Sequence, residues 1–391
     1  MDRPALRRVL LTLFGTGPLP DLSALNEADW IELDRIAQDH RLQPLLHARH
    51  RGSLNIPSAV LARWQTAHRH AAMVALVQQA DLAETSALLE QASFAPIALK
   101  GAWLSVHAYP EAAQRPMRDI DLLVPADAVI PAYRMLIAAG YEAGDKVEMP
   151  LEDVVRLDKH MPPLRAPRGT WVELHHRLWE RDGRLDHASP QADEAAMVAR
   201  AVPGPEAIRY LAPQDLLGHL IVHAIYSHRL DCGPLVLTDI AMLLHATPID
   251  WARFWGDATR QGWRDGARLL LELVRQYYPG TAIELADDPG VPAPAALLEA
   301  APDLLLQELG TRASAGLAAA AIKDGPRKLK QRLTGLRSAA GEQPVARNME
   351  HEGGFLGWAG SRAVRSLRDL SQADVRRQSR QLAALSKWLD R

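Results

Sequence analysis

The sequence predicts an α+β fold in which a small α/β domain with a mixed sheet lies between two all-helical modules. Helical periodicity without strand signals runs through residues 1–93 and resumes after residue 205. Between these stretches the chain alternates strand, helix, strand, helix and strand, which is the order of an α/β unit. We therefore expect four regions, at residues 1–93, 94–204, 205–324 and 325–391.

The first region is expected to begin with an amphipathic helix rather than a signal peptide. Its apolar run, LLTLF, is short, and the acidic residues Asp21 and Glu27 follow soon after it. A second helix is expected from the run EADW, because Asn26 before it can accept hydrogen bonds from the free amides of a first turn.

Composition favours a globular protein of two or three domains. Hydrophobic residues make up 48% of the 391 positions, which is enough to bury a large core. The single cysteine, Cys232, excludes an intrachain disulfide and argues against a thiolate zinc site. No stretch approaches the roughly 18 apolar residues that a membrane span needs, so we expect no transmembrane segment. The single cysteine fits a reducing cytoplasm, which is the compartment we expect.

Three short strands and two helices define the second region. They are expected as strands at residues 97–99, 117–124 and 170–176 and as helices at residues 102–108 and 129–139. Pro125 stops the second strand, since proline cannot donate to the ladder of a central strand. Gly140 follows the second helix, where a left-handed residue commonly ends a helix.

Two carboxylates stand on one face of the predicted strand 117–124. Successive side chains of a strand point to opposite faces, so Asp119 and Asp121 share a face that Ile120 does not. Carboxylates roughly 7 Å apart repel each other and are costly to desolvate unless a cation lies between them. Mg²⁺ or Mn²⁺ would suit these oxygen ligands, whereas a solvated edge strand is the alternative.

The predicted strand 170–176 supplies a third acid in an apolar setting. Glu173 shares a face with Trp171 and His175. Three acids on neighbouring strands suit a two-metal site, which clamps the attacking and leaving oxygens of phosphoryl or nucleotidyl transfer. His175 is expected either to touch a phosphate or to be a hydrogen-bonded structural histidine.

The pair Lys100–Gly101 marks the junction between the first strand and the following helix. Free amides and the helix dipole favour a phosphate there, and glycine permits a close approach. The pair is not a P-loop, because the spacing G-x-x-x-x-G-K-[ST] is absent.

These motifs carry a resemblance. The stretches LKGAWL, RPMRDIDLLV and WVELHHRL, within about residues 95–180, resemble the bacterial uncharacterised nucleotidyltransferase family of the DNA polymerase β-type nucleotidyltransferase superfamily. The resemblance implies that Asp119 and Asp121 are the metal-binding pair. It implies that Glu173 is a third catalytic acid, acting as general base or as ligand of a second metal.

The resemblance also implies a set of nucleotide-binding residues. Lys100 and Gly101 occupy the place of a Gly-Ser pair that holds the triphosphate tail, although the serine hydroxyl is missing here. Arg115 matches an arginine that can clamp a phosphate. His160 matches a family histidine, and with His175 it completes the expected set.

Residues outside these motifs lead to weaker expectations. Arg118 should point away from the two aspartates if the strand is regular. His219 and His223 lie one helical turn apart, but without an H-E-x-x-H motif they indicate a polar cluster, with His228 and Asp239, more than a zinc site.

The C-terminal region is basic. From residue 321 onward it holds fifteen Lys or Arg against seven Asp or Glu, in helical runs that usually form a solvated helix face. A linker is expected at residues 325–360. Aromatic residues for base stacking are sparse, so nucleic acid is not an expected partner.

Together these observations predict a magnesium-dependent enzyme. It would move a nucleoside monophosphate from a nucleoside triphosphate, with ATP as the expected nucleotide, to a hydroxyl of a peptide, sugar or small molecule. One alternative is a phosphotransferase that uses the same clamp. Another is a non-catalytic nucleotide-binding or antitoxin-like module, although three clustered acids have no physical reason to persist there.

Overall fold

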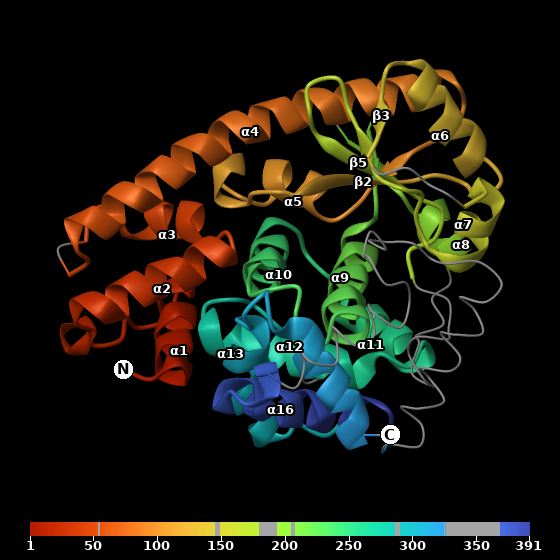
Figure 1. The fold of residues 1–391 in the computed structure, drawn as a ribbon. Coiled ribbons are helices and arrows are strands. Elements are labelled where there is room, and N and C mark those ends of the chain that lie inside the picture. Colours follow the sequence, from red (N-terminus) through yellow and green to blue (C-terminus); the bar gives the residue numbers. More distant parts are fainter. Residues whose placement is uncertain are drawn as a thin grey trace.

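The computed structural model describes residues 1–53, 55–144, 149–179, 194–204, 208–285, 290–323, 325 and 368–391. One mixed sheet is formed by the central part of the chain, and helices precede and follow it in the sequence (Figure 1). This arrangement confirms the predicted α+β class. No helix in these ranges combines the length and the apolar character that crossing a membrane requires.

The N-terminal module consists of helices that lead to the sheet. They are α1 (Arg3–Phe14), α2 (Glu27–Asp39), α3 (Gln43–His50) and α4 (Ser58–Gln91). The Asn26 side chain accepts a hydrogen bond from the Asp29 amide, and the Asp29 side chain accepts one from the Asn26 amide, which confirms the predicted cap. The long helix α4 reaches from this module across to the sheet (Figure 1).

The sheet has seven strands in the order β3-β4-β5-β2-β1-β7-β6. The strands are β1 (Ile97–Ala98), β2 (Asp119–Leu123), β3 (Glu142–Ala143), β4 (Leu164–Arg165), β5 (Trp171–His175), β6 (Val202–Pro203) and β7 (Arg209–Tyr210). β2 runs parallel to β5 and antiparallel to β1, while β7 runs parallel to β1. The sheet is therefore mixed, as predicted.

Short helices connect the strands. They are α5 (Gly101–His107), α6 (Val129–Ala138), α7 (Leu151–Leu157) and α8 (Glu194–Ala199). The helices predicted at residues 102–108 and 129–139 match α5 and α6 within a residue. Gly140 has a φ of 94°, so it adopts the left-handed conformation expected beyond α6.

The expectation that no strand follows residue 205 is wrong. β7 lies beyond that position and pairs with β1 through Ile97 and Arg209. Strands of two residues are too short to show alternation, and β3, β4 and β6 escaped prediction for the same reason. The proposed boundary at residue 204 thus falls between two strands of one sheet.

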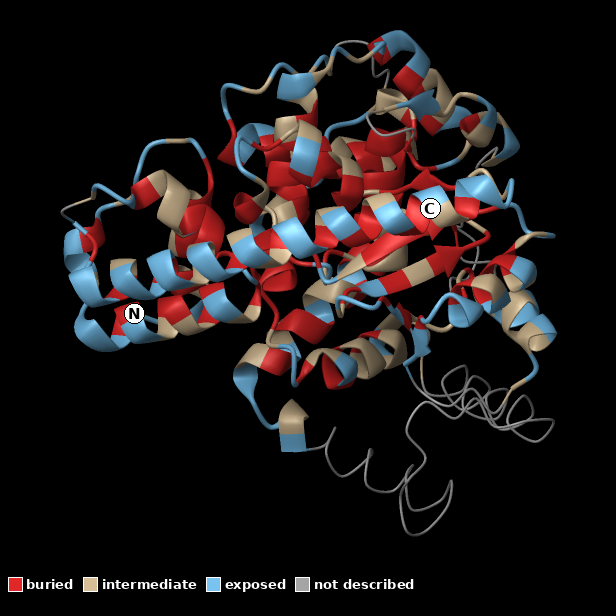
Figure 2. Cartoon of the chain, turned by 90° about the horizontal axis from the view of Figure 1, so that it is seen from above, coloured by how far each residue is buried: buried red, intermediate tan, exposed pale blue. Residues whose placement is uncertain are grey.

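The C-terminal helices cover the side of the sheet that carries the carboxylates. They are α9 (Pro213–Val222) with a π-helical turn at His223–Ser227, α10 (Leu235–Ala246), α11 (Trp251–Arg260), α12 (Arg264–Tyr277), α13 (Ala295–Leu305) and α16 (Ala373–Leu389). One hydrophobic cluster joins these helices to the N-terminal module and includes Leu33, Trp64 and Leu270. A second cluster, with Ile120 and Val172, lies between the sheet and helices α4 and α6. Figure 2 colours the strands of the sheet mainly as buried.

The basic C-terminal segment is only partly described. The expected linker lies outside the described residues except for Gly325. α16 is not simply a solvated helix, because Val375, Ala383 and Leu385 are buried and the helix contacts α13. The leucines and alanines of α16 form an apolar stripe, and this stripe packs against the protein although the helix is rich in arginine.

A buried arginine ties the two ends of the described chain together. Arg7 of α1 is 1% exposed and donates to Asp303 of α13 at 2.9 Å and to Asp374 of α16 at 2.6 Å. Removing the arginine would take a partner from the buried Asp303 and from the half-buried Asp374. Arg377 also contacts Asp303, at 2.8 Å, and compensates in part.

We predict that Arg7→Met lowers the free energy of unfolding by about 3 kcal/mol, measured by urea denaturation. The matched control is Arg134→Met, which removes an exposed arginine of α6 that lies 3.8 Å from Glu152. The control should change stability by less than about 0.5 kcal/mol. Equal effects of the two substitutions would contradict the role of the buried network.

Candidate active site

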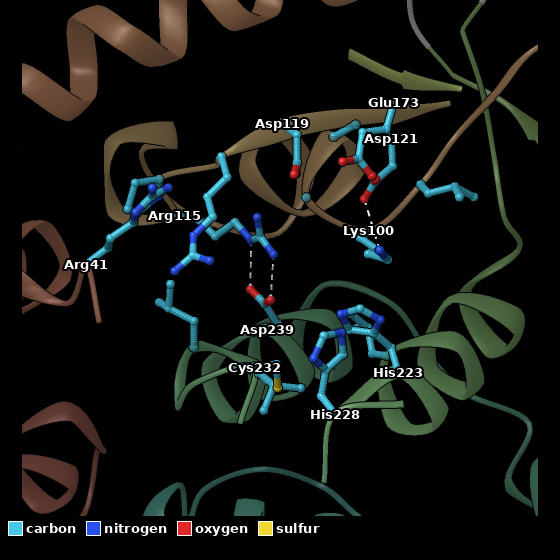
Figure 3. A pocket seen from close by; sticks show the side chains of 18 of the residues that line it. Arg41, Lys100, Arg115, Asp119, Asp121, Glu173, His223, His228, Cys232 and Asp239 are labelled. Atoms are coloured by element: carbon cyan, nitrogen blue, oxygen red, sulfur yellow. Dashed lines mark hydrogen bonds and ion pairs between the residues drawn. The ribbon is translucent and has the colours of Figure 1, made fainter. Parts of the chain in front are cut away.

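The pairing of β2 with β5 brings the predicted acids together. Asp121 is opposite Glu173 and Asp119 is opposite Trp171, so the carboxylates of adjacent parallel strands share one face. Figure 3 shows Asp119, Asp121 and Glu173 pointing into the same pocket. The strand alternation read from the sequence is therefore correct for these three residues.

The pocket has a volume of about 430 Å³ and receives residues from three parts of the chain. The sheet side supplies the acids, Lys100 and Gly101. The C-terminal helices supply the opposite wall, with His223, Cys232 and Asp239 among its residues (Figure 3). The N-terminal module contributes His40 and Arg41 to the lining of the pocket.

Asp121 is enclosed by positive groups. One carboxylate oxygen, Oδ2, lies 3.0 Å from Lys100 Nζ, and the other, Oδ1, lies 2.9 Å from His175 Nε2. Burial alone would raise the pKa of Asp121, but the Lys100 ammonium and the His175 imidazole lower it well below its usual value. Burial likewise opposes the charge of His175, yet Asp121 and Glu173 raise the pKa of this histidine.

Asp119 is in the opposite electrostatic situation. Burial, followed by the charges of Asp121 and Glu173, raises the pKa of Asp119 to about 6. Like charges that raise a carboxyl pKa indicate a site that still lacks positive charge. The charge of Lys100 reduces this shift without cancelling it.

The donor set fits a divalent cation. Ligand atoms of Asp121, Glu173 and His175 all lie within 4.8 Å of one another, and this is the group with metal-binding geometry in the described part of the chain. Two carboxylates and an imidazole suit Mn²⁺ and also Mg²⁺, which prefers oxygen. The sequence led us to expect Asp119 among the metal ligands and His175 beside the nucleotide. The group with metal-binding geometry contains His175 and does not include Asp119.

His160 lies next to the same acids. Its Nε2 is 3.7 Å from Glu173 Oε2, and its ring centre is 5.1 Å from that of His175. Burial alone would raise the pKa of Glu173, but His175 and His160 lower it, so this carboxylate is ionised at neutral pH. An ionised carboxylate can accept a proton.

The Lys100–Gly101 turn is shaped by a side chain. A Cβ on Gly101 would lie 2.2 Å from Arg115 Nη1, so a side chain at position 101 would displace the Arg115 guanidinium from its place over the turn. Lys100 has a φ of 43°, a left-handed conformation that favours glycine, and it directs its ammonium at Asp121. A strained residue whose side chain reaches the acids is typical of a functional site.

Arg115 is held from across the pocket by Asp239. Arg115 Nε and Nη2 donate to the two oxygens of this carboxylate at 3.1 and 2.9 Å (Figure 3). Tyr109 donates to the same group at 2.7 Å. The bidentate pair leaves Nη1 over Gly101. Arg115 was expected near a phosphate and Asp239 in a separate polar cluster, but the structure joins them.

The predicted histidine cluster forms part of the opposite wall. His223 and His228 line the pocket, while His219 is buried behind them, and neither of its ring nitrogens has a hydrogen-bond partner among the described residues. Burial, with help from Lys100, lowers the pKa of His219 and His223 well below the usual value, so both rings are neutral. These histidines form no metal-ligand group within the described ranges.

Several pocket residues escaped sequence reasoning. Arg118 was expected to point away from the acids but lines the pocket, because β2 begins only at Asp119 and the alternation does not extend back to it. His40, Arg41 and Lys159 also line it. Arg41 lies far from the motifs in sequence, and no local signal marks it.

The chain is similar to one known protein family. A model of the family described as uncharacterised nucleotidyltransferase matches residues 26–279. The chain belongs to this family. The match includes the helices on both sides of the sheet, beyond the motifs at residues 95–180 that suggested the resemblance. No similar curated protein and no similar solved structure was found.

The raised pKa of Asp119 leads to a prediction for metal binding at this site. Below about pH 6 a proton occupies Asp119 and competes with a cation, whereas above it the carboxylate is free. We expect the affinity for Mn²⁺, measured by calorimetry, to rise about tenfold between pH 5 and pH 7.5. Asp119→Asn should bind Mn²⁺ more weakly and lose the part of the pH dependence that Asp119 contributes, while the part that comes from protonation of His175 remains. An affinity independent of pH in the native protein would contradict the prediction.

Proposed function

We propose that this protein is a metal-dependent nucleotidyltransferase that moves a nucleoside monophosphate from a nucleoside triphosphate to an acceptor hydroxyl. The observation that carries the proposal is the lateral pairing of Asp121 with Glu173, next to Asp119, in a pocket that also holds Lys100 and Arg115. Membership of a nucleotidyltransferase family supports the transferase class. We further propose that the family belongs to the DNA polymerase β-type superfamily.

A divalent cation, Mg²⁺ or Mn²⁺, would be held by Asp119, Asp121 and Glu173 with His175. When bound, it neutralises the negative charge that phosphoryl oxygens develop during the reaction. Lys100 Nζ lies 3.0 Å from a carboxylate oxygen of Asp121. A cation at these acids would release the Lys100 ammonium toward the phosphates of the nucleotide.

The reaction balances with groups that the pocket contains. The acceptor oxygen attacks the α-phosphorus, the bond from that phosphorus to the oxygen bridging the β-phosphorus breaks, and pyrophosphate leaves. Glu173 is ionised and takes the acceptor proton, while His160 at 3.7 Å supports the orientation of its carboxylate. Arg115 Nη1, aimed over Gly101 by Asp239, is placed to bind a phosphate oxygen.

The acceptor is proposed by class only. We propose a peptide or sugar hydroxyl for a pocket that combines the neutral imidazole of His223 on one wall with the acids on the other. ATP is the proposed donor, and the cytoplasm is the proposed compartment. A phosphotransferase would use the same clamp but attack the γ-phosphorus, and the labelling experiment below separates the two reactions.

We predict that label from the α-phosphate of a nucleoside triphosphate moves to an acceptor when the protein is incubated with candidate peptides and sugars. Asp121→Asn and Glu173→Gln should lower the rate by at least about a hundredfold, because each removes a group that acts in the transition state. The matched control is Asp127→Asn, an exposed acid in the loop after β2, which should leave the rate unchanged.

Two outcomes would contradict the proposal. Transfer of the γ-label alone would replace nucleotidyl transfer by phosphotransfer. Binding of a metal nucleotide without transfer of any label, at equal affinity in the native protein and Asp121→Asn, would favour a non-catalytic module.

A further inference from the structure

Two arginines line the pocket near Asp119 without an ion-pair partner among the described residues. They are Arg41, which follows α2, and Arg118, which precedes β2. Arg41 Nη1 donates a long hydrogen bond of 3.5 Å to the carbonyl of Met117, the residue before Arg118. Burial, and then the charge of Arg118, lowers the pKa of Arg41. Two neighbouring cations of this kind favour an anion between them.

The backbone of Arg41 is a second indication that its side chain is selected for a task. Arg41 has a φ of 57°, and the Leu42 amide donates to the carbonyl of Ala37 at 2.8 Å. This helix ending normally places glycine at the left-handed position. An arginine is unfavourable there, and residues held in such conformations cluster at functional sites.

The position of the arginines relative to Glu173 decides which anion they would meet. Glu173 lies beside Asp121, Asp119 lies two residues back along β2, and Arg118 lies one residue further in the same direction. The arginines and Glu173 are therefore at opposite ends of the row of acids. In an in-line displacement the attacking and leaving oxygens stand on opposite sides of the phosphorus.

We propose that Arg41 and Arg118 form a subsite for the β- and γ-phosphates of the nucleotide, which leave as pyrophosphate. This inference rests on the proposed function, in which Glu173 marks the side of the acceptor. Guanidinium groups match phosphate oxygens with paired hydrogen bonds, so two of them suit a polyphosphate. The N-terminal helical module thereby contributes directly to substrate binding through Arg41.

The subsite can be tested by calorimetric titration of the full chain in the presence of Mg²⁺ with pyrophosphate, ATP and AMP as probes. The variants are Arg41→Gly and Arg118→Gln, with Arg134→Gln on the surface of α6 as control. Glycine suits the left-handed backbone at position 41, so Arg41→Gly should keep or raise the melting temperature.

We expect each pocket variant to lower the affinity for pyrophosphate and for ATP by about tenfold or more. The affinity for AMP should stay unchanged, because AMP lacks the leaving phosphates. The control should bind all three probes as the native protein does.

Three results would overturn the inference. They are a failure of the native protein to bind pyrophosphate, unchanged pyrophosphate affinity in both variants, and an equal loss of AMP affinity, which would place the arginines elsewhere on the nucleotide or on the acceptor. Arginine-dependent binding of pyrophosphate and ATP without transfer of any label would instead support the subsite and overturn only the proposed reaction.

Discussion

The parallel pairing of β2 with β5 is the constraint on which the site depends. It sets Asp121 beside Glu173 in a buried pocket, with Asp119 two residues away. Acids placed this way repel one another, and burial raises the cost. Lys100 and His175 offset that cost around Asp121, while Asp119 remains with a pKa raised to about 6. A divalent cation at the acids would supply the positive charge that is still missing.

The site is formed by the N-terminal module, the sheet and the C-terminal helices together, and not by the sheet alone. Asp239 of α10 reaches across the pocket to Arg115, which in turn lies over Gly101. Arg41 enters from the N-terminal module, whose helices share one hydrophobic cluster with the C-terminal helices. Because that cluster fixes both helical modules together, the walls of the pocket are held in position by apolar burial far from the acids.

The sequence predicted what depends on local pattern and missed what depends on distant contact. Alternation along single strands was enough to place Asp119, Asp121 and Glu173 on the face that forms the site. The pair Arg115–Asp239 joins residues 124 positions apart, and no periodicity links them. β7 was missed because two residues show no alternation, and Arg118 was misplaced because β2 begins at Asp119, two residues later than the pattern suggested.

The central claim is that a cation completes the row of acids on β2 and β5. A crystal structure with Mn²⁺ and a non-hydrolysable ATP analogue, with the metal located by its anomalous signal, tests this claim most directly. The account predicts Mn²⁺ bound to oxygens of Asp121 and Glu173 at ordinary ligand distances, with the Lys100 ammonium moved from Asp121 to a phosphate. Mn²⁺ bound away from these acids, or the analogue bound with the Lys100–Asp121 ion pair intact and no metal between the carboxylates, would contradict it.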